Sequence, residues 1–218
     1  MPDGVIQRDA REIYDPGYIV KHRKTGSPAL HSDLFKYAML AKIEMLWVDL
    51  DIIALKPFSF PSPWVFGYEG PDAVNGAVLG MPRESAALAA LLEFKHDTIG
   101  LPQYLSGTRR LKYLLRSLGR GLPINRWPWV AVGPRALTYY LQMTGEISHT
   151  LPQSAFYHVP LENARLLVAP DAVSRESLPP EAWAVHLWGK KLRTVIAEEF
   201  GGTIPTGSFL ANEMESVR

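Results

Sequence analysis

Apolar residues recur at helical spacing in four stretches of the chain. The first is SDLFKYAMLAK, residues 32–42, in which apolar side chains at positions 34, 37, 38 and 41 fall on one side of a helix. Ser32 stands where an N-cap residue belongs, with Asp33 in the first turn. The same spacing predicts further helices over residues 85–95, 109–118 and 135–143.

Short apolar runs between these helices predict strands. The longest run is LWVDLDII, residues 46–53. Shorter strands are predicted over residues 64–68, 77–79, 155–159 and 183–188. The alternation of helices and strands favours an α/β layer architecture over a helix bundle or a β-sandwich. Since 47% of the 218 residues are hydrophobic, we expect a single domain that covers residues 1–218.

The composition excludes several classes of function. The chain has no cysteine, which excludes disulfides, thiolate metal sites and cysteine nucleophiles. Lys and Arg number 23 against 22 Asp and Glu, so the overall charge gives no reason to expect a nucleic-acid partner. No apolar run reaches the roughly 18 residues that span a bilayer, and the first residues do not resemble a signal peptide. We therefore expect a cytoplasmic location.

Two aspartates stand near the end of the strand predicted over residues 46–53. Side chains at i and i+2 of a strand face the same way, so Asp49 and Asp51 are predicted to lie side by side. Two carboxylates about 5 Å apart repel by roughly 3 kcal/mol at an effective dielectric constant of 20. An arginine, a shared proton or a divalent cation would offset this repulsion. The alternative is that the strand ends in solvent and the two aspartates only cap a turn.

The segment around these aspartates is similar to a known family. Residues 31–58, HSDLFKYAMLAKIEMLWVDLDIIALKPF, resemble the sugar-binding segment of glycosyltransferases with a DXD motif, the group of family 32 and the capsular-polysaccharide transferases. In that family, a helix that begins Ser-Asp-Leu-Leu-Arg-Tyr leads into a strand that ends in Asp-x-Asp. Weaker matches follow in the family's order: Asn75-Gly76 before AVLGMP, GPRALT at 133–138 and HLW at 186–188.

The resemblance implies a fold and an activity. The fold is of the GT-A type, a nucleotide-binding α/β sandwich. The activity is that of a hexosyltransferase, which moves a sugar from a nucleotide-diphosphate sugar donor to a glycan or glycolipid acceptor in polysaccharide biosynthesis, with retention of the anomeric configuration. The implied cofactor is Mn²⁺ or Mg²⁺, which neutralises the charge that develops on the leaving nucleotide diphosphate.

The resemblance also assigns roles to residues of the DXD segment. Asp49 and Asp51 would be catalytic and would bind the metal, and Asp49 would also contact the donor. Asp33 would form a hydrogen bond with the ribose or the sugar of the donor. Lys36 stands where the family has Arg, so a bidentate contact is replaced by a point charge.

Two residues outside that segment complete the candidate site. His186, in WAVHLWG, is a further candidate metal ligand, and the alternative is a partly buried imidazole whose hydrogen bonds are satisfied within the protein. Asn75 is the candidate for a polar group near the reacting carbon.

The chain also departs from the family pattern. The family has Tyr-Gly-Gly before the DXD strand, where this chain has Ile43-Glu44-Met45. The family's first strand, Ile-Pro-Lys-Ile-Ile-His-Gln-x-Trp, has no match, and MPDGVIQRDAREIY resembles the segment that follows it. We therefore expect an N-terminally truncated GT-A fold, a misassigned start, or a protein that has lost donor binding.

Two other functions fit parts of the sequence. The first is a degenerate glycosyltransferase-like domain with a binding or scaffold role. The second is a phosphatase of the haloacid-dehalogenase type, which also has Asp-x-Asp after an apolar strand. That fold needs a later acidic pair, for which this chain offers Glu198-Glu199 in a segment predicted to be helical.

Residues 108–120, TRRLKYLLRSLGR, predict a basic amphipathic helix. Such a helix could lie on an anionic membrane surface, which would place the protein at the inner face of the membrane near a lipid-linked acceptor. The more common meaning of this pattern is a helix that packs its leucines into the core and exposes its basic face.

Overall fold

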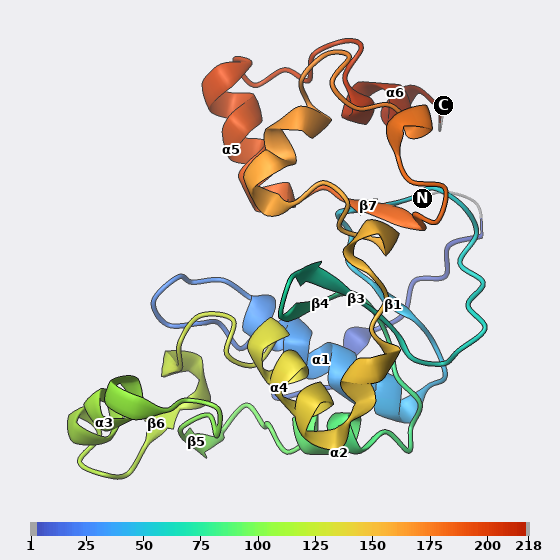
Figure 1. Cartoon of the computed structure of the whole chain (residues 1–218). Helices are drawn as coiled ribbons and strands as arrows, with labels where there is room; N and C mark the ends of the chain where they lie inside the picture. Colours follow the sequence, from blue (N-terminus) through green and yellow to red (C-terminus); the bar gives the residue numbers. More distant parts are fainter. Residues whose placement is uncertain (1–3, 217–218) are drawn as a thin grey trace. The chain divides into compact units, whose positions relative to one another are not determined.

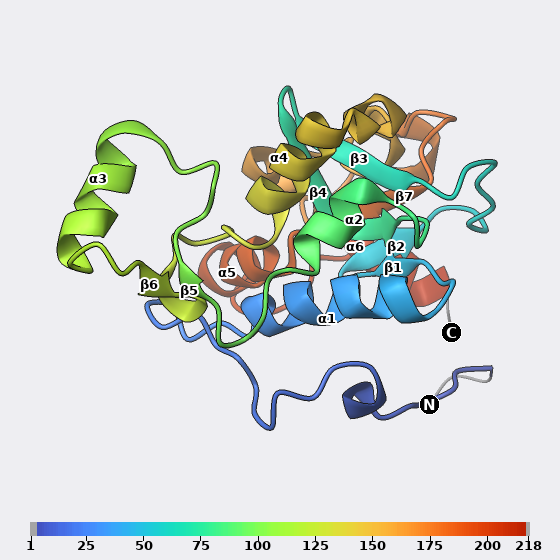
Figure 2. The same cartoon turned by 90° about the horizontal axis from the view of Figure 1, so that it is seen from below.

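The computed structural model describes residues 4–216 and divides the chain into two compact units (Figures 1 and 2). Unit 1 comprises the residues up to 46 together with residues 80–148, and unit 2 comprises residues 47–79 together with those from 149 onward. The protein is a mixed α/β protein, in which helices accompany small sheets. Among the helices of residues 4–216, none is both long enough and apolar enough to cross a bilayer.

Unit 1 is built around three helices: α1 (Ala29–Lys42), α2 (Ala86–Leu91) and α4 (Pro134–Thr144). Helix α2 packs against α4 and also contacts α1. The faces that meet carry buried apolar side chains, among them Leu40, Leu88 and Leu137. Helix α2 begins where Ser85 accepts a hydrogen bond from the backbone N–H of Leu88, which satisfies one of the free donors at the helix start.

A smaller element of unit 1 carries the helix α3 (Gly107–Arg116). Its base is an antiparallel pair of two-residue strands, β5 (Ile99–Gly100) and β6 (Leu122–Pro123). Figures 1 and 2 show α3 beyond this pair of strands, away from α1, α2 and α4.

Unit 2 contains the other two sheets of the described chain. One has the strand order β1-β4-β3, formed by β1 (Trp47–Val48), β4 (Ala73–Gly80) and β3 (Val65–Gly70). The other pairs β2 (Ile52–Ala54) with β7 (Ala184–His186) in antiparallel register. The strands β1 and β4 also pair antiparallel. Consecutive strands β1 and β2 therefore belong to different sheets.

Unit 2 also contains two α-helices. Helices α5 (Gly189–Glu199) and α6 (Phe209–Ser216) follow β7 and share an apolar cluster with the segments before them. Buried members of this cluster include Leu167, Val185 and Val195.

Short 3-10 helices occur in both units. Those described are η1 (Ala10–Glu12), η2 (Ile124–Arg126), η3 (Glu146–His149), η4 (Gln153–Ala155), η5 (Leu161–Leu167) and η6 (Arg175–Ser177).

The structure confirms the four helices that the apolar spacing predicts, with shifted ends. Helix α1 begins three residues before Ser32 and has Pro28 as its N-cap residue, so the N-cap prediction for Ser32 is wrong. Helix α2 ends at Leu91, earlier than the predicted end at Lys95.

Two strand predictions are wrong. Residues 155–159 are not a strand: Ala155 ends η4, and the side chains of Phe156 and Tyr157 are buried anchors of the core. The segment is still hydrogen-bonded to the residue before β7, because Ala155 O accepts a hydrogen bond from the backbone N–H of Trp183. The single strand predicted over residues 46–53 is replaced by β1, a turn and β2.

Candidate functional site

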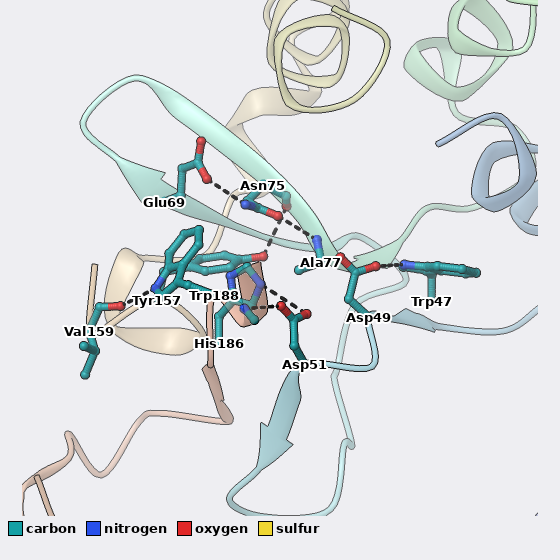
Figure 3. A network of polar contacts seen from close by, with 11 residues as sticks. Trp47, Asp49, Asp51, Glu69, Asn75, Ala77, Tyr157, Val159, His186 and Trp188 are labelled. Carbon is teal, nitrogen blue, oxygen red and sulfur yellow. Dashed lines mark hydrogen bonds and ion pairs between the residues drawn. The ribbon is translucent and has the colours of Figure 1, made fainter. Parts of the chain in front are cut away.

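The two aspartates of the DXD segment lie in the turn between β1 and β2. The backbone N–H of Ile52 donates to Asp49 O at 3.2 Å, which closes the turn, and the side chain of Leu50 at its tip is fully exposed. The prediction that Asp49 and Asp51 share one face of a strand is therefore wrong. In Figure 3 the Asp49 carboxylate points toward Trp47, whereas the Asp51 carboxylate points toward His186. The turn relieves the repulsion by giving each carboxylate its own partner.

Asp51 is placed next to His186 by the pairing of β2 with β7. Ile52 is the register partner of His186, and the backbone N–H of Leu187 donates to Asp51 O at 2.8 Å. This pairing sets His186 Nε2 3.3 Å from Asp51 Oδ1. The other carboxylate oxygen, Oδ2, accepts from the backbone N–H of Gly189 at 2.8 Å.

These contacts keep Asp51 ionised. Burial by itself would raise the pKa of Asp51, since it disfavours the charged form. The hydrogen bonds from His186 and from the Gly189 N–H, together with the attraction of His186, outweigh burial and lower the pKa to about 2. The Asp51 side chain keeps 34% of its surface exposed, so an anionic group at this position also meets solvent.

His186 is enclosed by aromatic rings. The ring of Trp188 lies 4.1 Å from the imidazole, centroid to centroid, and the ring of Tyr157 lies 5.7 Å away. The His186 Nδ1 atom is buried and has no hydrogen-bond partner among the described residues. Nε2 is therefore the ring nitrogen that faces the Asp51 carboxylate and can donate a hydrogen bond to it.

Trp188 turns the chain from β7 into α5. Its φ of 54° lies in the left-handed region, which costs a residue with a side chain roughly 1 kcal/mol or more. Its indole Nε1–H donates to Val159 O at 2.8 Å and holds the ring in place (Figure 3). This turn aims the first N–H of α5, that of Gly189, at Asp51. A carboxylate at a helix start is stabilised by the free N–H groups and the helix dipole.

Asp49 is held by Trp47 and by the edge of the neighbouring strand. The indole Nε1–H of Trp47 donates to Asp49 Oδ1 at 2.6 Å, and the Asp49 backbone N–H donates to Ala77 O at 2.7 Å. Ala77 belongs to β4, so Asp49 continues the pairing of β1 with that strand. The indole contact fixes the direction of this carboxylate.

Asn75 lies on β4 beside this edge, with its amide bonded at both ends. Its Nδ2 donates to Glu69 Oε2 at 2.6 Å, and its Oδ1 accepts from the Ala77 N–H at 2.8 Å. The Tyr157 hydroxyl donates to Asn75 O at 3.4 Å, and burial raises the pKa of Tyr157 well above its ordinary value. The amide of Asn75 thus links Glu69 of β3 to Ala77 of β4, the residue whose carbonyl accepts the hydrogen bond from the Asp49 N–H (Figure 3).

Asp33 and Lys36 form an ion pair on α1 in unit 1. Lys36 Nζ lies 3.3 Å from Asp33 Oδ1, and both side chains are largely buried, with exposed fractions of 7% for Lys36 and 15% for Asp33. Gly133, the N-cap residue of α4, approaches so closely that an added Cβ would lie 2.6 Å from Asp33 Oδ2. Asp33 therefore sits between a cation and the positive end of a helix.

The donor set around Asp51 fits a cation only in part. Within residues 4–216, no group of three or more His, Asp or Glu side chains is arranged to hold a metal ion. Asp51 Oδ1 and His186 Nε2 are 3.3 Å apart, close to the roughly 3 Å that separates neighbouring ligands of Mg²⁺ with bonds of about 2.1 Å. The pair could supply two ligands, and waters and phosphate oxygens would have to supply the rest.

No protein-family model, curated protein or solved structure matches the chain. The candidate residues are held in place by four residues that the sequence did not identify as part of the site: Trp47, Tyr157, Trp188 and Gly189. Trp188 and Gly189 adjoin His186 in HLWG, and Trp47 stands two residues before Asp49, so their positions in the sequence could have drawn attention to them.

Proposed function

We propose that the protein transfers a sugar from a nucleotide-diphosphate sugar, with a divalent cation bound between the donor diphosphate and Asp51. The observation that carries the proposal is the approach of Asp51 to His186 across β2 and β7, two candidate ligands that lie 135 positions apart in the sequence. The proposal rests on residues of unit 2 and on the resemblance of residues 31–58 to DXD glycosyltransferases. It includes the GT-A type fold that this resemblance implies.

Asp51 would be the main protein ligand of the cation. It is ionised at any physiological pH, because its pKa is about 2, and a third of its side-chain surface is open to a ligand. His186 Nε2 can bind the same ion only without a proton, whereas a hydrogen bond to Asp51 requires a proton on that nitrogen, so His186 ranks second. Bound Mn²⁺ or Mg²⁺ would neutralise the charge that develops on the leaving nucleotide diphosphate.

The remaining residues would orient these ligands. Trp47 holds the Asp49 carboxylate in one direction, which suits a contact with the ribose, the sugar or a water on the cation. Asn75 would lie near the reacting carbon, and its two amide hydrogen bonds would hold β4 in place there. A retaining transfer by front-face attack needs no dedicated base from the protein, and the proposed site includes none.

The incomplete set of metal ligands leads to a specific prediction about nucleotide binding. Since the described residues place only Asp51 and His186 together as ligands, the cation should bind well only together with the nucleotide diphosphate, whose oxygens complete its shell. Calorimetric titration of UDP and of GDP, each with and without Mn²⁺, tests this. We expect Mn²⁺-dependent binding of one nucleotide, and a loss of at least tenfold in affinity for Asp51→Asn.

The control variant for this titration is Asp72→Asn, which removes a carboxylate from the exposed turn between β3 and β4. Its affinity should equal that of the wild type. Equal binding by Asp51→Asn and wild type, or binding that ignores Mn²⁺, would overturn the proposed role of Asp51.

A second candidate is a binding protein without transferase activity. It is favoured by the engagement of both Asn75 amide atoms and both Asp51 carboxylate oxygens within the protein itself. The two candidates differ in turnover. Release of nucleotide from UDP- or GDP-sugars in the presence of Mn²⁺ and an acceptor supports the transferase, and tight nucleotide binding without any release supports the binding protein.

A further inference from the structure

Helix α3 exposes the apolar residues that an ordinary packed helix would bury. The exposed fractions are 57% for Leu111, 68% for Leu115 and 88% for Leu118, which follows the helix. None of the residues from Gly107 to Arg116 is buried. The common interpretation of the 108–120 pattern, a helix with its leucines in the core, is therefore wrong here.

The outward side of α3 carries a row of leucines beside a row of cations. Leu111 and Leu115 are four residues apart and so lie on one side of the helix, and Lys112 and Arg116 form the adjacent row. The partly buried positions are Tyr113, Leu114 and Ser117, which define the inward side. The outward side thus has the arrangement of a helix that lies in a bilayer interface, with leucines toward the acyl chains and cations among the headgroups.

The stretch of sequence that contains α3 carries charge of a single sign. Residues 98–145 contain seven of the 23 basic residues of the chain and none of its 22 acidic ones. Within the described chain, neither Lys112 nor Arg116 forms an ion pair, and the same holds for Arg109 and Arg120. A field of this sign is complementary to an anionic surface, although the net charge of the whole chain is only +1.

The base of this element is firmly tied to unit 1. The buried Trp127 donates its indole N–H to Gly100 O at 3.0 Å and to Leu122 O at 2.9 Å, one carbonyl from each strand of the β5-β6 pair. Gly121 has a φ of 79°, and an added Cβ would lie 2.5 Å from the Cα of Gly100, so only glycine fits there. The exposed leucines are thus presented from a fixed base.

We infer that α3 binds the surface of an anionic lipid bilayer, with Leu111, Leu115 and Leu118 inserted and Lys112 and Arg116 in contact with the headgroups. This inference goes beyond the proposed transfer reaction and does not depend on it. It explains together the exposed leucines, the unpaired cations and the lack of acidic residues in residues 98–145.

Co-sedimentation with vesicles tests the inference, using phosphatidylcholine alone and phosphatidylcholine with phosphatidylglycerol. The full chain should bind the anionic vesicles, and binding should weaken as salt is raised. Lys112→Gln with Arg116→Gln should lower the partition coefficient roughly 25-fold, about fivefold per charge. Leu111→Ser with Leu115→Ser should lower it about tenfold or more.

Matched control variants separate α3 from the rest of the surface. Lys21→Gln with Lys24→Gln removes two exposed cations elsewhere in unit 1, and Met143→Ser removes an exposed apolar side chain from α4. Both should bind like the wild type. Because the substituted leucines are exposed, circular dichroism of the variants should match the wild type, and Leu118→Ser, outside the helix, gives a second measure of insertion.

Three results would overturn the inference. The first is no preference for anionic vesicles in the wild type. The second is loss of binding in the charge variant but not in the leucine variant, which means electrostatic adsorption without insertion. The third is α3-dependent binding of an acidic polypeptide or RNA with no vesicle binding, which means a macromolecular partner.

Discussion

Two acidic residues in different units, Asp33 and Asp51, each have a cationic or imidazole partner at 3.3 Å, yet they differ in access to solvent. Asp33 is paired with Lys36 within helix α1, and its side chain is only 15% exposed. Asp51 is paired with His186 across two strands and keeps 34% of its surface. The first carboxylate is enclosed by its own unit, whereas the second has both a fixed direction and an open side. The open carboxylate is the one suited to meet a ligand.

The largest expected effect comes from opening the enclosed pair. Lys36→Met keeps the length of the side chain but leaves Asp33 without its cation in a nearly closed site. We expect a loss of about 3 kcal/mol in the free energy of unfolding, measured by urea denaturation. Lys24→Met, at an exposed position, is the control and should change little. Equal stability of the two variants would show that the α1 pair is not a structural contact.

A smaller effect is expected at the open pair, and it depends on pH. The pKa of Asp51 is about 2 in the folded protein, below its ordinary value near 3.8. The contribution to stability is therefore complete above pH 4 and is lost as the pH falls through 2. After allowance for solvent screening, it amounts to about 1–2 kcal/mol.

Asp51→Asn should therefore unfold more easily than the wild type at pH 7, and the difference should shrink between pH 4 and pH 2. Denaturation midpoints over this range measure it, with Asp72→Asn as the control. A difference that persists unchanged at pH 2 would mean that Asp51 does not act through its charge.

The smallest effect is expected from crowding the Asp51 carboxylate. In Gly189→Ala the new Cβ would lie 3.0 Å from Asp51 Oδ2, so the carboxylate must shift and its bond from the Gly189 N–H must weaken. The free energy of unfolding should change by no more than about 0.5 kcal/mol. The pKa of Asp51, followed by NMR of its carboxyl carbon, should rise from about 2 toward its ordinary value.

The control for this variant is Gly70→Ala, where an added Cβ meets no atom within 4 Å. It should leave the pKa of Asp51 unchanged. If Gly189→Ala also leaves that pKa unchanged, the start of α5 does not help to hold the carboxylate.

The sequence predicted local structure well wherever apolar residues kept helical spacing over a long stretch. Helices α1 and α4 each show apolar spacing over at least two turns, and their positions are confirmed to within a few residues. The strand over residues 46–53 failed for the opposite reason. Leu50 continues the apolar run in the sequence but is fully exposed at a turn, and side-chain type alone cannot show which leucine is at the surface.

The site could be predicted only as a set of residues. The resemblance pointed to Asp51 and His186, but their contact depends on the pairing of β2 with β7, which leaves no local trace in either segment. The partner of Asn75 was likewise hidden, because Glu69 has no recognisable spacing to it. Trp47, by contrast, stands two residues before Asp49, the spacing of side chains on one face of a strand. The exposure of the α3 leucines also required the structure, since a packed helix and an interfacial helix share one sequence pattern.

The most direct test of the central claim follows free Mn²⁺ by electron paramagnetic resonance as protein is added, with and without the nucleotide that calorimetry identifies. We expect weak uptake of Mn²⁺ by the protein alone, strong uptake when the nucleotide diphosphate is present, and loss of that strong uptake in Asp51→Asn but not in Asp72→Asn. Nucleotide-dependent uptake that is the same in Asp51→Asn and in the wild type would contradict the claim that Asp51 shares a cation with the donor.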